Sequence, residues 1–329
     1  IEGSMVFSKD LMKKHNIPTA FYEVFTDSEK AIEYLKKQNT YPAVIKADGL
    51  ALGKGVIIAQ NEQEAVDAVN SMINDKKFGE SGSRVVVEEF LTGPEVSVLA
   101  FTDGKTIVPM ISSMDHKRAY DNDEGLNTGG MGTVSPNPYY TKEIAAECME
   151  KIFIPTVNAM NAEGRTFEGC LYFGLMLTPN GPKVIEYNCR FGDPETQVVL
   201  PMLDADLYEV FEAIYNHELD KVNIGIKDGS CACVVMASGG YPQSYPKGIE
   251  MFGFDEKGQI DGCFVYHAGT KLSDDGKFLT NGGRVIGVTA NAENLQSALD
   301  KAYAGVSKIS FENAHYRKDI GQRALKALN

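Results

Sequence analysis

The sequence predicts a mixed α/β (α+β) protein of two or three domains. The first observation behind this prediction is length, because 329 residues exceed what one compact core usually holds. The second is that short apolar segments typical of strands alternate with segments whose apolar residues recur at helical spacing. The third is composition: 43% hydrophobic and 23% charged residues are typical of a globular chain.

Four segments make up the predicted domain organisation, at 1–20, 21–96, 97–225 and 226–329. Strands are expected at 43–47, 56–59, 84–90 and 95–102, and helices at about 141–162 and 292–305. The segment at 21–96 has the size of a small domain that can fold as a unit.

The start of the chain is expected to contain one short helix. Ser8 is a residue type that caps helices, and the residue before Pro18 is disfavoured in a helix, so we expect a helix from Ser8 to about His15. Residues 1–4 resemble a remnant of cloning and are left out of this fold prediction.

Residues 48–55 (Asp-Gly-Leu-Ala-Leu-Gly-Lys-Gly) lie between two predicted strands. Their spacing matches neither the P-loop nor the Gly-x-Gly-x-x-Gly fingerprint of dinucleotide-binding domains. A glycine-rich hairpin can fold its backbone N–H groups over phosphate oxygens, and Lys46 near the end of the preceding strand would point a cation at the same phosphates. A plain flexible hairpin explains this segment equally well when it is read by itself.

Residues 185–197 carry a carboxylate, an amide and a guanidinium at alternate positions of a predicted strand end. Side chains at i and i+2 share one face of a strand, so Glu186, Asn188 and Arg190 would project together. Two oxygen donors suit Mg²⁺, and the planar Arg fork suits a carboxylate or a phosphate. Ordinary polar residues at a strand edge are the alternative interpretation of this pattern alone.

Two further segments have the composition of ligand-binding loops. Residues 85–91 run from an apolar strand into a linker, whose backbone groups could pair with a purine edge, although acidic residues at a strand exit are more often solvated. Residues 115–118 (Asp-His-Lys-Arg) and 127–132 (Asn-Thr-Gly-Gly-Met-Gly) combine cations with backbone amides that we expect to be free, as in an anion-binding nest. A solvated loop is the alternative.

Charge and cysteine content exclude several classes of protein. The net charge of −13 argues against a nucleic-acid partner, because such binding depends on clustered Lys and Arg. The six cysteines include no Cys-x-x-Cys pair, which favours reduced core thiols in a cytoplasmic protein over a zinc site. No apolar run is long enough to cross a membrane. The sequence makes no prediction of oligomeric state.

Taken together and in this order, the motifs resemble those of the ATP-grasp superfamily. Within it they resemble the phosphoribosylamine–glycine ligase (glycinamide ribonucleotide synthetase) family. The resemblance covers nearly the whole chain and is carried by residues 46–49, 53–55, 115–118, 127–132, 186–195, 237–242, 267–270 and 281–285.

The resemblance implies an enzyme of de novo purine synthesis. It would use ATP with Mg²⁺ (or Mn²⁺) to join glycine to 5-phosphoribosylamine through a glycyl phosphate, giving glycinamide ribonucleotide, ADP and phosphate. Family members begin with an additional Gly-rich domain, so a shortened chain that binds ATP and Mg²⁺ with weak or no synthesis is an alternative. Another ATP-grasp carboxylate–amine ligase is a second alternative.

The resemblance also implies roles for particular residues. Glu186 and Asn188 match the family's metal ligands, and Tyr172 stands where many superfamily members have another metal-binding carboxylate. The expected catalytic residues are Arg190, Asp115 and Lys117. The expected nucleotide- and substrate-binding residues are Lys9, Lys46, Gly53, Lys54, Gly55, Glu88, Glu89, Phe90, Leu91, Glu95, Asn127, Gly130, Met131 and Gly132.

Overall fold

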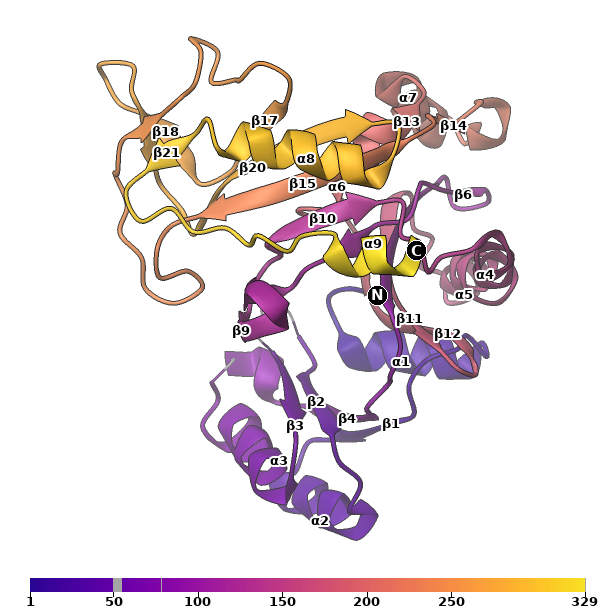
Figure 1. Ribbon diagram of the computed structural model, residues 1–329. Helices are drawn as coiled ribbons and strands as arrows, with labels where there is room; N and C mark the ends of the chain where they lie inside the picture. The colour runs from indigo at the N-terminus through magenta and orange to yellow at the C-terminus, as the bar shows by residue number, and fades with distance from the viewer. Residues whose placement is uncertain (50–54, 78, 329) are drawn as a thin grey trace. The chain divides into compact units, whose positions relative to one another are not determined.

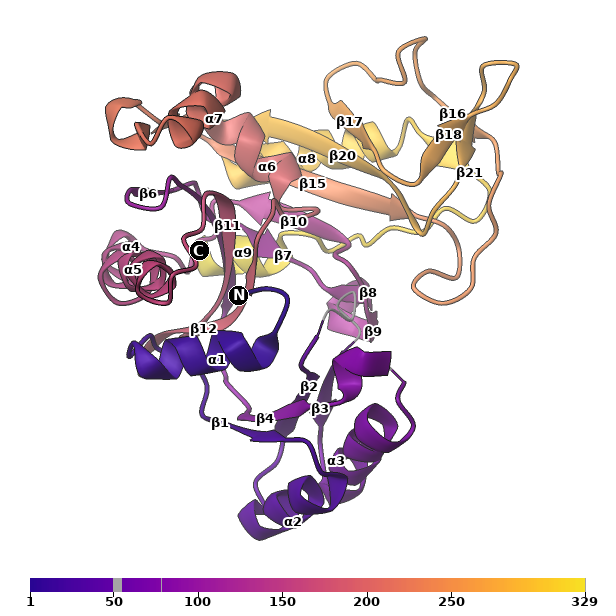
Figure 2. The same cartoon turned by 180° about the vertical axis from the view of Figure 1, so that it is seen from behind.

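The computed structural model describes residues 1–49, 55–77 and 79–328. The chain divides into two compact units (Figures 1 and 2), and each is described by itself. Unit 1 contains Ile1–Glu95, Ala100–Ile107 and Lys142–Arg190, and unit 2 contains Val96–Leu99, Val108–Thr141 and Phe191–Asn329. Both units combine helices with antiparallel sheets, so the predicted α/β (α+β) class is confirmed.

The first sheet of unit 1 has the strand order β1-β4-β2-β3, with every neighbouring pair antiparallel. Helices α2 and α3 supply the residues that pack on one of its faces, where Ile45 and Val87 are buried. The elements are β1 (Tyr22–Phe25), α2 (Ser28–Gln38), β2 (Ala43–Ala47), β3 (Val56–Ala59), α3 (Glu62–Val69), the π-helical turn η1 (Asn70–Asn74), the 3-10 turn η2 (Gly79–Gly82) and β4 (Val85–Glu89).

Side-chain alternation gives this sheet two chemically different faces. Ile45 and Val87 point to the helices α2 and α3, so Lys46, Val86 and Glu88 point the other way. On that second face Val86 packs against Val6, which comes from the first helix of the chain. Charged residues are therefore held on the face that the first helix covers.

The rest of unit 1 is built around the long hairpin of β11 and β12. These strands belong to a second sheet with the order β12-β11-β5-β6, of which β5 and β6 are divided between the two units. The elements are α1 (Met5–Lys14), β5 (Glu95–Thr102), β6 (Ile107–Pro109), α4 (Lys142–Cys148), the π-helical turn η4 (Met149–Phe153), α5 (Ile154–Ala162), β11 (Gly169–Thr178) and β12 (Gly181–Asn188).

Helix α1 begins earlier than the sequence analysis expected. Its cap is Ser4, whose side chain accepts a hydrogen bond from the amide of Phe7, whereas Ser8 lies buried inside the helix. The prediction that Ser8 caps this helix was therefore wrong, and so was leaving residues 1–4 out of the fold. Serine is a preferred residue type at the N-terminal cap of a helix. Ser4 was not considered as the cap because residues 1–4 had been left out.

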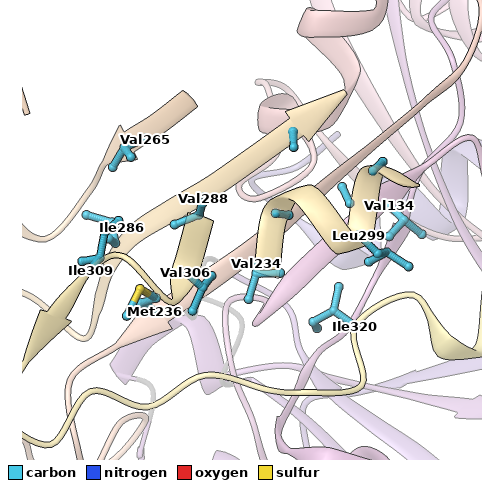
Figure 3. Close-up of a cluster of buried hydrophobic side chains, with 14 of the residues drawn as sticks. Val134, Val234, Met236, Val265, Ile286, Val288, Leu299, Val306, Ile309 and Ile320 are labelled. Atoms are coloured by element: carbon cyan, nitrogen blue, oxygen red, sulfur yellow. The ribbon is translucent and has the colours of Figure 1, made fainter. Parts of the chain in front are cut away.

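Unit 2 is organised by a five-stranded antiparallel sheet with the order β17-β20-β15-β10-β7. Helix α8 packs on one face, and Figure 3 shows Leu299 and Val306 of this helix beside Val234 and Val288 of the sheet. The sheet strands are β7 (Met114–Asp115), β10 (Gly132–Ser135), β15 (Ser230–Ala237), β17 (Phe264–His267) and β20 (Arg284–Ala292).

Short elements complete unit 2. They are β8 (Arg118–Tyr120), η3 (Asp121–Asp123), β9 (Glu124–Asn127), α6 (Thr196–Val199), η5 (Leu200–Met202), β13 (Leu203–Asp204), α7 (Leu207–Tyr215), η6 (Leu219–Lys221), β14 (Gly225–Ile226), β16 (Met251–Phe252), β18 (Thr270–Leu272), β19 (Phe278–Thr280), α8 (Leu295–Val306), β21 (Ser310–Phe311) and α9 (Gln322–Leu328). Within the described parts of the chain, no helix has the length and apolar character needed to span a membrane.

Candidate functional site

Two lysines share one buried carboxylate in unit 1. The Nζ atoms of Lys9 and Lys46 each lie 3.1 Å from Oε2 of Glu88, and all three side chains are almost fully buried. With all three groups ionised, one positive charge is left without a countercharge inside the cluster. Such a surplus is costly in a protein interior unless an anion is nearby, so this cluster is suited to receive phosphate oxygens.

Three elements bring this cluster together. Lys46 and Glu88 come from the neighbouring strands β2 and β4 and lie on the face of the sheet opposite α2 and α3. Lys9 comes from α1, and its Nζ also donates to Oγ1 of Thr19 over 2.7 Å. The Thr19 hydroxyl in turn donates to the carbonyl oxygen of Val184 over 2.7 Å, which ties the cluster to β12.

The surroundings of Lys9 shift the pKa of its ammonium group. The pKa of Lys9 is lowered to about 8, chiefly by burial; the carboxylate of Glu88 opposes this shift, and the positive charge of Lys46 adds to it. The second oxygen of Glu88, Oε1, is buried and accepts no hydrogen bond from the described residues. Lys9 thus sits near the midpoint of its titration at mildly alkaline pH, where a nearby anion would favour the charged form.

The cluster lies next to the predicted metal ligands in this unit. Nζ of Lys46 donates to the carbonyl oxygen of Ile185 over 3.1 Å, and Ile185 immediately precedes Glu186 on β12. Glu186 and Asn188 are two residues apart on this strand and share a face. Lys46 of one sheet and the strand end of another that carries Glu186 are thus adjacent within one compact unit.

Glu186 and Asn188 have the donor set that a Mg²⁺ ion prefers. Both offer oxygen atoms, and the carboxylate of Glu186 has no hydrogen-bond or ion-pair partner among residues 1–49, 55–77 and 79–328. From the described residues, Oδ1 of Asn188 accepts only a long contact of 3.4 Å, from Nη2 of Arg190. The same described residues contain no cluster of three or more His, Cys, Asp or Glu. A Mg²⁺ ion held by Glu186 and Asn188 would keep water molecules and phosphate oxygens as further ligands.

Arg190 follows β12 and lies beside the start of the chain. Its Nε is 3.8 Å from Oε1 of Glu2, whose other oxygen accepts the amide of Cys189 over 2.7 Å. Tyr172, which the sequence analysis placed where many superfamily members have a further carboxylate, pairs with Asn188 in the β11–β12 ladder and is buried. Its phenol does not replace a carboxylate as a charged ligand.

The predicted adenine and ribose contacts lie at and after the end of β4. Glu89 accepts hydrogen bonds from Nζ of Lys183 over 2.7 Å and from the amide of Phe21 over 3.0 Å. Phe90 is exposed, Leu91 is partly buried, and Glu95 is exposed at the start of β5. The amide of Glu89 donates to the carbonyl oxygen of Phe21 over 3.0 Å, and the carbonyl oxygen of Pro94 accepts the amide of Leu177 over 2.9 Å, so the backbone is held on both sides of this connection.

The glycine-rich segment is described only at its ends. Asp48 accepts hydrogen bonds from Ser4 and from the amide of Val6, and the carbonyl oxygen of Gly55 accepts the amide of Ala47 over 2.8 Å. Gly53 and Lys54, which were expected to contact phosphates, lie outside the described residues.

The segments at 115–118 and 127–132, which were predicted to form an anion-binding loop, lie in unit 2. Asp115 accepts the amide of His116, and Lys117 accepts the amide and hydroxyl of Thr128 through its carbonyl oxygen. Asn127 is exposed at the end of β9, whereas residues 130–132 are buried.

The backbone amides of that loop are already occupied. Gly130 donates to Oγ1 of Thr128 over 3.0 Å, and Met131 donates to the carbonyl oxygen of His116 over 2.8 Å. Gly132 belongs to the β10–β15 ladder. The expectation of a nest of free amides was therefore wrong, because these amides fold the loop onto its neighbours.

Sequence reasoning gave no role to Arg284, which connects three motifs of unit 2. Its guanidinium donates to the carbonyl oxygen of Gly129 over 2.7 Å and to the carbonyl oxygen and side chain of Asp193 over 2.8 and 3.0 Å. Its position in the motif at 281–285 was the only sequence feature that pointed to this residue. A motif alone does not predict which groups an arginine will bond.

Comparison with known proteins decides the family. Residues 3–196 match "Phosphoribosylglycinamide synthetase, ATP-grasp (A) domain", and residues 231–323 match the C domain of the same enzyme. The chain belongs to the phosphoribosylglycinamide synthetase family. The resemblance inferred from the motifs is thereby confirmed.

Relatives in this family differ in length. A phosphoribosylamine–glycine ligase from Fusobacterium nucleatum is 47% identical over 98% of this chain and 75% of its own length. The trifunctional purine biosynthetic protein adenosine-3 of Gallus gallus is 50% identical over 100% of this chain. The chain spans 33% of the length of that relative and 32% of its counterpart in Bos taurus.

Solved structures confirm the ATP-grasp fold. Phosphoribosylamine–glycine ligase from Thermotoga maritima has a TM-score of 0.88 and 35% identity, covering 97% of this chain and 78% of its own. The biotin carboxylase domain of 2-oxoglutarate carboxylase from Hydrogenobacter thermophilus shares the fold with a TM-score of 0.71 at 16% identity, covering 100% of this chain and 70% of its own.

The first testable prediction concerns the shared carboxylate. Glu88→Gln leaves two buried lysines without their countercharge, so we expect it to lower the free energy of unfolding by about 3 kcal/mol. Glu89→Gln is the matched control, because its partly exposed ion pair with Lys183 is worth at most about 1 kcal/mol. Urea unfolding followed by circular dichroism measures both, and equal losses would contradict the assignment.

The second prediction concerns Lys9. Between pH 8 and 10.5 the unfolded chain holds the proton on Lys9 while the folded chain has released it, so the stability contributed by this residue rises with pH. Relative to Lys9→Met, wild type should gain up to about 3 kcal/mol across this window. Urea unfolding at several pH values measures the difference. Lys14→Met, at an exposed position, is the control and should show no such trend, and parallel curves for wild type and Lys9→Met would refute the shift.

Proposed function

We propose that this chain is an ATP-dependent ligase that joins glycine to 5-phosphoribosylamine. The reaction forms glycinamide ribonucleotide, ADP and phosphate by way of a glycyl phosphate. The observation that carries the proposal is the buried cluster of Lys9, Glu88 and Lys46, which is hydrogen-bonded to β12 directly beside Glu186. Membership of the phosphoribosylglycinamide synthetase family supplies the substrates.

The chemistry explains why a phosphate-binding site precedes amide formation. A carboxylate is a poor electrophile until one of its oxygens is part of a leaving group. In the first step a glycine carboxylate oxygen attacks the γ-phosphorus of ATP, and the bond to the bridging oxygen of ADP breaks. In the second step the amine nitrogen attacks the glycyl carbonyl carbon, phosphate leaves, and the nitrogen loses a proton.

The residues of unit 1 would act on the nucleotide. Lys9 and Lys46 would neutralise phosphate oxygens with the positive charge that Glu88 leaves uncompensated, and Arg190 would steady the acyl phosphate with its planar fork. Residues 88–91 would receive the adenine and Glu95 the ribose hydroxyls. Gly53, Lys54 and Gly55 belong to the same proposal as contacts of the phosphates.

Glu186 and Asn188 would hold Mg²⁺ or Mn²⁺. When bound, the ion offsets the negative charge that builds up on the transferred phosphoryl group. These residues orient it through one charged and one neutral oxygen donor.

The residues of unit 2 would act on the other substrates. We assign Asp115, Lys117 and Asn127 to the region that binds glycine and phosphoribosylamine, together with residues 130–132, whose role is to shape the loop. The proposed domains are a lid at 21–96, a core at 1–20 and 97–225, and a C-terminal domain at 226–329. A cytoplasmic location is proposed as well, since all six cysteines, each within the described chain, are free thiols.

The assay that tests the activity measures ADP release while one substrate at a time is omitted. We expect full turnover only when ATP, glycine and 5-phosphoribosylamine are all present, with the amine generated in place from ribose 5-phosphate and ammonia. Mass spectrometry should find glycinamide ribonucleotide. ADP release that needs no amine, or that prefers another amino acid in a panel, would overturn the proposal.

The metal assignment has its own test. Glu186→Ala removes the charged ligand, so the apparent affinity for Mg²⁺ in the presence of ATP should fall roughly tenfold or more. Glu186→Gln keeps an oxygen donor and should lose less. Glu33→Ala, on an exposed position of α2, controls for the loss of a surface carboxylate. Isothermal titration with Mg²⁺ measures all three, and an unchanged affinity in Glu186→Ala would remove this residue from the site.

A further inference from the structure

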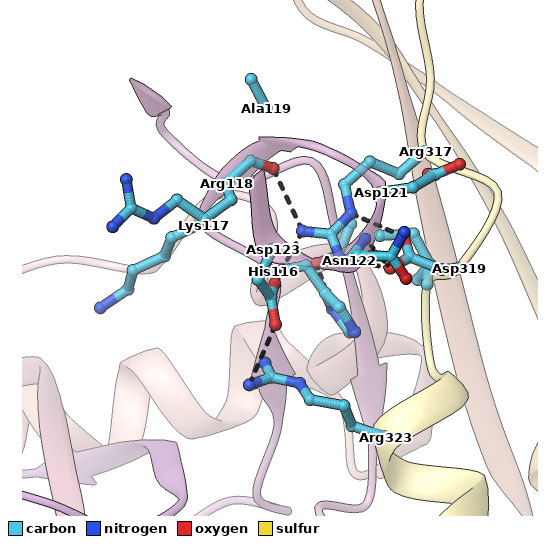
Figure 4. A network of polar contacts seen from close by, with 12 residues as sticks. His116, Lys117, Arg118, Ala119, Asp121, Asn122, Asp123, Arg317, Asp319 and Arg323 are labelled. Atoms are coloured by element: carbon cyan, nitrogen blue, oxygen red, sulfur yellow. Dashed lines mark hydrogen bonds and ion pairs between the residues drawn. The ribbon is translucent and has the colours of Figure 1, made fainter. Parts of the chain in front are cut away.

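A buried polar network in unit 2 surrounds Arg317 (Figure 4). Arg317 is only 1% exposed, and its guanidinium donates to Oδ1 of Asp123 over 3.0 Å and to both oxygens of Asp319 over 2.8 Å. Its Nη1 also donates to the carbonyl oxygen of Arg118 over 3.2 Å. One side chain thus joins the segment near the end of the chain to residues about two hundred positions earlier.

We call residues 315–321 the C-terminal strap. The strap is bonded to the β8–β9 hairpin along its whole turn. Nε2 of His315 contacts the carbonyl oxygen of Ala119 at 2.7 Å. The amide of Lys318 donates to Oδ1 of Asp121, and the amide of Asn122 donates to Oδ2 of Asp319, each over 2.8 Å.

His116 forms a second connection between the strap and the same region. The amide of Gly321 donates to Nε2 of His116 over 3.1 Å, so Nδ1 carries the proton and donates to the carbonyl oxygen of Gly132, also over 3.1 Å. The pKa of His116 is lowered to about 4, chiefly by burial and in addition by the charges of Arg317 and Arg323. The ring is therefore neutral near pH 7 and keeps one donor and one acceptor in place.

The hairpin needs this external support. A two-stranded hairpin is marginally stable by itself, every residue of β9 is exposed, and the register shifts between Arg118 and Tyr120. Stability alone does not explain the network, because well-packed apolar side chains often stabilise a core as well as a buried ion pair does. A buried arginine fork instead fixes direction, since it bonds several partners in one plane.

The hairpin region carries the cations that the sequence analysis selected. In Figure 4, Lys117 and Arg118 extend to the side away from Arg317 and Asp319. The backbone of Lys117 is held by Thr128, and Nη1 of Arg118 donates to the carbonyl oxygen of Gly125 over 2.8 Å. Two neighbouring cations on one supported hairpin suit an anionic group such as a phosphate monoester.

We propose that Arg317 and His116 are positioning residues, which hold the β8–β9 hairpin so that Lys117 and Arg118 receive the phosphate of the amine substrate. This inference rests on the proposed function and deepens it, because it assigns the recognition of one substrate to one hairpin. Neither Arg317 nor His116 touches substrate, and both act through the backbone of residues 116–127.

The test compares Arg317→Met with Arg323→Met. Arg317→Met keeps an unbranched side chain but removes the fork, so we expect the KM for 5-phosphoribosylamine to rise roughly tenfold to a hundredfold. The Kd for ATP should stay within about twofold, because the ATP contacts proposed above lie in unit 1. Arg323 is an exposed second partner of Asp123, and Arg323→Met should behave as wild type.

Two further readouts separate positioning from mere folding. Hydrogen exchange followed by mass spectrometry should show faster exchange at residues 117–127 in Arg317→Met, at a temperature where circular dichroism shows the protein folded. His116→Gln keeps a donor and an acceptor and should retain most of the affinity for the amine, whereas His116→Phe keeps the ring shape and should lose it. If Arg317→Met fails to fold, Arg317→Lys and the His116 pair carry the same comparison.

The outcomes are distinguishable. Wild-type protein that releases ADP without using the amine overturns the proposed function and this inference together. Wild-type turnover with an unchanged KM for the amine in folded Arg317→Met and His116→Phe overturns this inference alone. A raised KM confined to these two variants, with faster exchange in the hairpin, supports it.

Discussion

The interaction on which unit 1 depends is the carboxylate of Glu88 held between Lys9 and Lys46. It joins α1 to the first sheet, and the further bonds from Thr19 to Val184 and from Lys46 to Ile185 join that sheet to β12. A cluster of this kind is a poor source of stability, because three charges are withdrawn from water. Its value lies in placing two cations at a fixed distance from the strand that carries Glu186.

The alternation of side chains along β2 and β4 makes this placement possible. Ile45 and Val87 fill the core under α2 and α3, so the residues between them must face α1. A shift of either strand by one residue would exchange the two sets and bury the charges among the helices. The apolar core and the polar site are therefore fixed by the same register, and neither can change without the other.

Sequence predicted those features that depend on local pattern. Strands at 43–47, 56–59 and 95–102 appear at the same residues, and the shared face of Glu186 and Asn188 follows from a strand of eight residues. Two- and three-residue strands such as β7 and β8 have too few residues for a period to be recognised. The partner of Glu88 on α1 and the amide partners of Gly130 and Met131 arise from tertiary packing, which no spacing along the chain records. The role of Arg317 was hidden for the same reason, since its partner Asp123 lies 194 positions earlier.

The two buried charge clusters, around Glu88 and around Arg317, differ in their net charge. This difference indicates that one binds a ligand and the other holds the fold in place. Around Arg317 no positive charge is left over, because Arg317 and Arg323 pair with Asp123 and Asp319 while the carboxylate of Asp121 lies beside Asp319, and the guanidinium fork is used within the protein. Around Glu88 one positive charge has no countercharge within the cluster, and one carboxylate oxygen has no hydrogen-bond donor among the described residues. A cluster with no surplus positive charge gains nothing from an anion, whereas one with a surplus positive charge is stabilised by it. This difference in charge is why we assign the phosphates of ATP to the first cluster and a positioning role to the second.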